Sequence, residues 1–117
     1  METTMVEQPT RTVVLRDEHD GADSRHLSAH LTAAGDLVLD GQDLGPATAT
    51  LTGEDEYEWI TTVRSAYLPA LVALLDTDPG VSLLDVLEAR YTGTAAAELE
   101  GILSTGTVPV ERSTYRG

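Results

Sequence analysis

The stretch that decides the fold is residues 26–39, HLSAHLTAAGDLVL. Leu27, Ala29 and Leu31 alternate with polar residues, which is the period of a β-strand with one buried face. Gly35 follows where a tight turn needs a positive φ angle, and three apolar residues then lead the chain back. This stretch therefore predicts a β-hairpin with one apolar face.

Further strands are predicted on both sides of this hairpin. Residues 12–15 form a short apolar run that we interpret as the first strand, and the polar residues 17–24 predict a loop. Residues 57–64 alternate again and are rich in aromatic and β-branched types, which favours a strand. Residues 42–53 contain two glycines and a proline and predict a loop, with residues 47–51 as a candidate irregular strand.

The apolar period then changes from two residues to 3.6, which predicts helices. Leu68, Leu71 and Leu75 lie on one face of the first predicted helix. A second helix is predicted to begin after Ser82, because Ser82 and Asp85 have the spacing of a capping box.

A third helix is predicted over residues 95–103, with Thr94 as its cap and Leu99 facing inward. Residues 108–114 predict a final strand. Pro109 either confines that strand to an edge of the sheet or lies among the first residues of the strand, since proline cannot donate a hydrogen bond to a neighbouring strand.

Strands followed by helices and one closing strand predict an α+β fold. We expect an antiparallel sheet of about four to five strands packed on two to three helices. Residues 1–10 predict a disordered N-terminal tail. Residues 11–117 predict a single α+β domain, in keeping with a chain of 117 residues.

The composition excludes several classes of function. A formal net charge of −13 disfavours nucleic acid and anionic membranes as partners, because both are negatively charged. The absence of cysteine excludes disulfides, thiolate nucleophiles and cysteine-ligated metals. The chain has no apolar run of about 20 residues that would span a membrane and no signal-peptide pattern, so we expect a cytoplasmic protein.

The negative charge is concentrated before the predicted helices. Residues 17–58 contain eleven acidic residues and one arginine, which gives a net charge of −10. This charge is either a solvated face or a docking surface for a basic protein. Tyr57 and Trp59 either pack in the core or anchor that docking surface. The candidate partner-binding residues are Asp36, Asp40, Asp43, Glu54, Asp55, Glu56, Tyr57, Glu58 and Trp59.

Several groups of residues suggest metal binding, and each has a simpler interpretation. They are the aspartates Asp17, Asp20 and Asp23, the pair Asp40 and Asp43, the histidines His19, His26 and His30, and the pair Asp76 and Asp78. The aspartate spacing does not match an EF-hand. On a strand, His26 and His30 would lie about 13 Å apart, which is too far to share one ion. We predict no metal site and no cofactor.

The sequence contains no phosphate-binding glycine loop, no nucleophile elbow and no zinc-protease motif. We therefore expect a non-enzymatic binding module that docks a basic protein through the acidic side of the hairpin, although these absences leave an enzyme open. One alternative is an immunity protein or antitoxin that neutralises a basic effector. The other is a small enzyme or ligand-binding protein with a pocket between sheet and helices. The sequence does not define an oligomeric state.

Three stretches carry a resemblance to other proteins. They are residues 15–30 (LRDEHDGADSRHLSAH), residues 35–45 (GDLVLDGQDLG) and residues 56–59 (EYEW). These stretches resemble small uncharacterised acidic proteins of actinobacteria. The resemblance implies the cytoplasm of a bacterium with a GC-rich genome, and it implies no particular chemistry.

Overall fold

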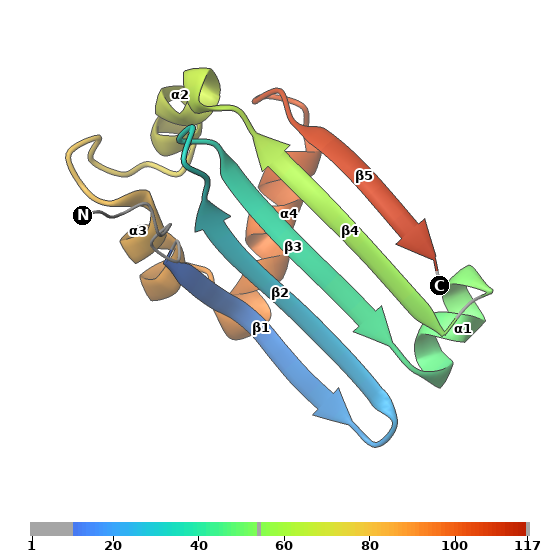
Figure 1. Cartoon of the computed structure of the whole chain (residues 1–117). Helices are drawn as coiled ribbons and strands as arrows, with labels where there is room; N and C mark the ends of the chain where they lie inside the picture. Colours follow the sequence, from blue (N-terminus) through green and yellow to red (C-terminus); the bar gives the residue numbers. More distant parts are fainter. Residues whose placement is uncertain (1–10, 54, 117) are drawn as a thin grey trace, which may run out of the picture.

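The computed structural model describes residues 11–53 and 55–116, and it forms a five-stranded antiparallel sheet in which every strand pairs with the next along the chain (Figure 1). The strands are β1 (Thr12–Asp20), β2 (Asp23–Leu31), β3 (Leu37–Leu44), β4 (Glu56–Val63) and β5 (Glu111–Arg116). This sheet and its helices confirm the predicted α+β class. The predicted disordered tail, residues 1–10, lies outside the described residues.

Four α-helices accompany the sheet in the part of the chain that the structure describes. They are α1 (Pro46–Thr52), α2 (Leu68–Leu74), α3 (Leu83–Arg90) and α4 (Ala96–Ser104). The first connects β3 to β4 at the end of the sheet, whereas the other three follow one another between β4 and β5. Figure 1 shows α3 and α4 behind one face of the sheet, with no helix drawn over the other. We call these two sides the helix-facing face and the open face.

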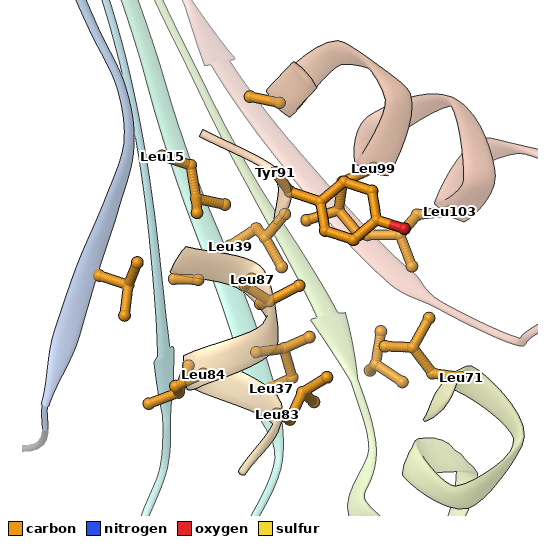
Figure 2. Close-up of a cluster of buried hydrophobic side chains, with 14 of the residues drawn as sticks. Leu15, Leu37, Leu39, Leu71, Leu83, Leu84, Leu87, Tyr91, Leu99 and Leu103 are labelled. Carbon is orange, nitrogen blue, oxygen red and sulfur yellow. The ribbon is translucent and has the colours of Figure 1, made fainter. Parts of the chain in front are cut away.

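The hydrophobic core lies between the helix-facing face and the helices. Leucines from β1 and β3 meet leucines from α2, α3 and α4, and Tyr91 closes the cluster (Figure 2). The alternation predicted from the sequence is confirmed here, because Leu27 and Ala29 are buried while the neighbouring His26 and His30 are only half-buried. Gly35 has the predicted positive φ of 87° in the β2–β3 turn.

The prediction of a loop at residues 17–24 is wrong. β1 continues to Asp20 and β2 begins at Asp23, so that Gly21 and Ala22 alone form the turn. Figure 1 shows this end of the β1–β2 hairpin extending beyond the helices. Its side chains face water on both sides of the sheet, so no apolar alternation marks the strands.

The predicted loop at residues 42–53 is also corrected. β3 continues to Leu44, and the stretch considered for an irregular strand forms α1. Pro46 occupies the first helical position, where its missing N–H costs no hydrogen bond. Gly53 ends the helix with a left-handed φ of 86°. Proline at the start and glycine after the end were the available signals for this short helix.

The predicted helix caps do not form. Ser82 is the N-cap residue of α3 but makes no side-chain capping bond, and Asp85 pairs with Arg11 instead. Thr94 lies within a 3₁₀ turn, and α4 begins at Ala96 without a side-chain cap. The predicted inward face of this last helix is confirmed, since Leu99 and Leu103 are buried. The final strand is shifted toward the C-terminus, from the predicted residues 108–114 to Glu111–Arg116.

Candidate functional site

The nine predicted partner-binding residues do not form one surface. By strand register, Asp40, Glu56 and Glu58 belong to the open face, whereas Asp43, Tyr57 and Trp59 belong to the helix-facing face. Asp55 is exposed just before β4, and Asp36 lies in the β2–β3 turn. Glu54 lies outside the described residues. Successive side chains of a strand point to opposite faces, so residues that are neighbours in the sequence are divided between the two sides of the sheet.

Asp36 is a structural residue and not part of an exposed surface. Its carboxylate is buried and accepts hydrogen bonds from the backbone N–H of Ser65 at 2.8 Å and from the Arg64 guanidinium at 3.1 Å. Arg64 also donates two hydrogen bonds to Glu111. The hydrogen bonds to Glu111 and then to Asp36 raise the pKa of Arg64 above its ordinary value. Asp36 therefore joins the β2–β3 turn to the chain leaving β4.

Trp59 is likewise buried, with 5% of its surface exposed, so it packs in the core and cannot anchor a partner. Its ring stacks on Tyr57 with ring centres 5.5 Å apart. Its indole Nε1 donates a hydrogen bond of 3.1 Å to Glu100 Oε2 on α4. Of the two interpretations that the sequence left open for Trp59, the core position is the one observed.

Glu100 also binds an arginine that a β-bulge turns inward. Arg16 Nη2 donates to Glu100 Oε1 at 2.9 Å, and only 4% of the Arg16 side chain is exposed. The register of β1 against β2 shifts between Val14 and Arg16, so that both Leu15 and Arg16 are buried. A regular strand would direct one of these neighbours to the open face. Glu100 thus joins β1 and β4 to α4.

The open face carries three acidic residues of the predicted set, Asp40, Glu56 and Glu58. Gln42 of β3 donates side-chain hydrogen bonds to Glu56 Oε2 at 3.1 Å and to Glu58 Oε2 at 3.3 Å. Asp40 is exposed on the same strand, two residues before Gln42. Asp17 of β1 accepts from His19 at 3.0 Å. Gln42 is neutral, so it holds the two glutamates in place without cancelling their charge.

The three strand arginines whose side chains the structure describes, Arg16, Arg25 and Arg112, do not occupy open-face positions. Arg16 points into the core, Arg25 pairs with Asp43 at 3.5 Å, and Arg112 lies opposite Thr61 on the helix-facing face. Asp40, Glu56 and Glu58 therefore make no ion pair with a described arginine, whereas Asp17 lies beside His19 and His26. Negative charge without a described arginine partner is thus left at Asp40, Glu56 and Glu58 on the open face.

The open face also presents apolar side chains among these carboxylates. Val14 is 49% exposed and Tyr115 is 60% exposed. Tyr115 of β5 lies directly opposite Glu58 in the strand register, and Ile60 is two residues further along β4. An acidic surface with exposed apolar groups matches the composition of protein interfaces better than a uniformly charged one does.

The candidate metal ligands do not come together. Within residues 11–53 and 55–116, no group of three or more His, Asp or Glu side chains is arranged to hold a metal ion. His26 and His30 both belong to β2, four residues apart. Asp78 accepts a hydrogen bond from the backbone N–H of Gly80, which is the turn role that the simpler interpretation gave it.

A cavity of about 470 Å³ lies between the sheet and α4. It is lined by Leu39, Thr61, Glu100, Leu103, Ser104, Gly106, Val108, Pro109, Val110 and Arg112. The sequence suggested a pocket between sheet and helices as one alternative but did not locate it. Its residues come from β3, β4, α4, β5 and the segment before β5, so no local motif marks it.

Comparison with known proteins finds no matching family model, no similar curated protein and no similar solved structure. The helices in the described part of the chain are all too short or too polar to cross a membrane.

Proposed function

We propose that this protein is a non-enzymatic, cytoplasmic binding module that docks a basic protein on the open face of its sheet. The observation that carries the proposal is the pair Glu56 and Glu58, whose carboxylates share the neutral amide of Gln42. This surface replaces the one expected from the sequence, because Asp36 and Trp59 are buried. Asp40, Glu56 and Glu58 remain from the original set.

Electrostatics supports a basic partner. Like charges held side by side repel one another, and a bound cation would remove that repulsion. Arginine or lysine side chains of a partner would gain charge-assisted hydrogen bonds from Glu56 and Glu58. The formal net charge of −13 would also accelerate encounter with a basic protein.

The apolar groups supply the second part of the interaction. Val14 and Tyr115 are exposed toward opposite edges of the face, and covering them would remove apolar surface from water. Tyrosine is enriched among residues that dominate binding energy. We therefore assign Tyr115 the anchoring role that the sequence suggested for Trp59.

The test is affinity capture from the lysate of the native host at low and high salt, followed by identification of bound proteins by mass. We expect a stoichiometric basic protein that binds at low salt and is released at high salt. A captured protein with toxic activity would make this module an immunity protein or antitoxin, which is a special case of the same docking.

Two double variants make the test specific to the open face. Glu56→Lys with Glu58→Lys reverses two open-face charges, whereas Glu88→Lys with Glu98→Lys makes the same change in net charge on α3 and α4. The first should abolish capture and the second should retain it. Equal capture by the two variants, or no partner at either salt concentration, would overturn the proposal.

A further inference from the structure

We propose that the cavity between α4 and the sheet binds a small amphipathic carboxylate, with its apolar body inside and its carboxylate at Arg112. This site lies on the helix-facing side of the sheet and is independent of the docking surface proposed for the open face. Its volume of about 470 Å³ falls within the range of small-molecule sites, about 300–1,000 Å³.

The lining favours an apolar ligand body. Leu39 from the sheet and Leu103 from α4 contribute side chains that also belong to the core, and Val108 is buried beside them. Val110 and Pro109 complete an apolar wall along the segment that leads into β5. An alkyl or aryl group placed here would leave water for an apolar environment.

Arg112 supplies a positive group for the ligand head. Four other arginines, namely Arg11, Arg16, Arg25 and Arg64, each pair with a carboxylate of the protein. Arg90 donates to the carbonyl oxygen of Leu75. Arg112 makes no ion pair or side-chain hydrogen bond with any residue that the structure describes, although the chain is strongly acidic. Its planar guanidinium suits two-point binding of a carboxylate.

Thr61 provides a second polar contact beside Arg112. The two residues lie directly opposite each other on β4 and β5, and both line the cavity. Thr61 is 7% exposed and lines the cavity, so its hydroxyl can donate a hydrogen bond to a ligand there. A ligand carboxylate between Arg112 and Thr61 would accept hydrogen bonds from both groups.

Glu100 does not reverse this preference for an anion. Its Oε1 accepts from Arg16 and its Oε2 accepts from Trp59, so its negative charge is balanced within the protein. These bonds also connect the cavity to Trp59, the only tryptophan of the chain. Ligand entry beside Glu100 should therefore change the fluorescence of Trp59.

The test is a fluorescence titration of the full chain with three probes that share one apolar tail: decanoate, decanol and decylamine. The titration uses monomeric probes in 0.15 M NaCl, where charge interactions are screened beyond about 8 Å. We expect decanoate to bind at least ~10-fold more tightly than either other probe, which is the effect of a charge-assisted hydrogen bond. Equal affinities, a preference for decylamine, or no saturable binding would overturn the proposal.

Pairs of test and control variants identify the residues that bind the carboxylate of the ligand. Arg112→Gln should weaken decanoate binding by ~10-fold or more while leaving decanol unchanged. Arg25→Gln, on the same face of the sheet but outside the cavity, is its control. Thr61→Val should weaken decanoate binding by a smaller factor, and Thr62→Val, on the open face, should not. Unchanged decanoate affinity in folded Arg112→Gln would contradict the assignment.

Discussion

Gly41 of β3 lies directly beneath the indole ring of Trp59 on β4. The two residues are opposite each other in the strand register, and a Cβ atom at position 41 would collide with three carbons of the ring. The missing side chain therefore lets the indole lie across β3 and reach Glu100 on α4. The close approach of backbone and ring makes glycine a packing requirement at this position.

This packing predicts that Gly41→Ala destabilises the protein. The added methyl group must displace Trp59, which we expect to cost about 1–3 kcal/mol of unfolding free energy as in other overpacked cores. Chemical denaturation followed by tryptophan fluorescence measures the change. Gly101→Ala is the matched control, because a Cβ there meets no atom within 4 Å and alanine favours the α4 helix. Equal stability of Gly41→Ala and the wild type would contradict the packing.

The pair Arg16 and Glu100 predicts a strongly non-additive double-mutant cycle. Glu100→Leu leaves the buried Arg16 without its counter-charge, and we expect a loss of about 3 kcal/mol. Adding Arg16→Met removes the unpaired charge and should recover part of that loss, because Trp59 Nε1 still lacks its acceptor. The measurement is the free energy of unfolding of the two single variants and the double variant. Simple addition of the two single losses would show that the ion pair is not coupled.

Replacing Asp36 should lower the stability of the protein far more than replacing Asp40, although the two residues are only four positions apart. Asp36→Ala removes the acceptor for Ser65 N–H and Arg64, and we expect it to cost about 1–3 kcal/mol. Asp40→Ala changes an exposed side chain and should stay within about 0.5 kcal/mol of the wild type. Thermal unfolding of both variants checks the difference, and equal melting temperatures would refute the structural role of Asp36.

Gln42→Lys should stabilise the folded protein by placing a cation between Glu56 and Glu58. We expect a gain of about 0.5 kcal/mol, typical of a cross-strand charge pair at a surface. Because the gain is electrostatic, it should disappear in 1 M salt. Ser113→Lys, opposite Ile60 on the same face, is the control and should gain less. A gain that persists at high salt would point to packing instead of charge.

Sequence periodicity predicts the parts of the fold in which one side of an element is buried. The alternation in residues 26–39 and in β4 identifies the strands, and the 3.6-residue stripe that includes Leu71 identifies α2. Periodicity fails at the exposed end of the β1–β2 hairpin, because both sides of those strands meet water. It also fails at α1, whose seven residues are too few to establish a helical stripe.

The site is less predictable than the fold because it depends on contacts between distant residues. The composition identifies an acidic region but does not say which side chains the sheet directs to each face. The bond between Arg16 and Glu100 joins residues 84 positions apart, and no local pattern records it. The bulge at Leu15 inserts one residue into the period of two, so alternation alone places Arg16 on the wrong face.

The same bulge affects how copies of the chain would meet. β1 is an edge strand, and a regular exposed edge is a template on which strands of other molecules can pair and aggregate. The irregularity next to Val14 interrupts the even spacing of backbone donors and acceptors on this edge. Asp17, Glu18 and Asp20 follow on the same strand, so two aligned copies would bring like charges together. The bulge that turns Arg16 toward the core should therefore also disfavour the addition of strands from other molecules to this edge.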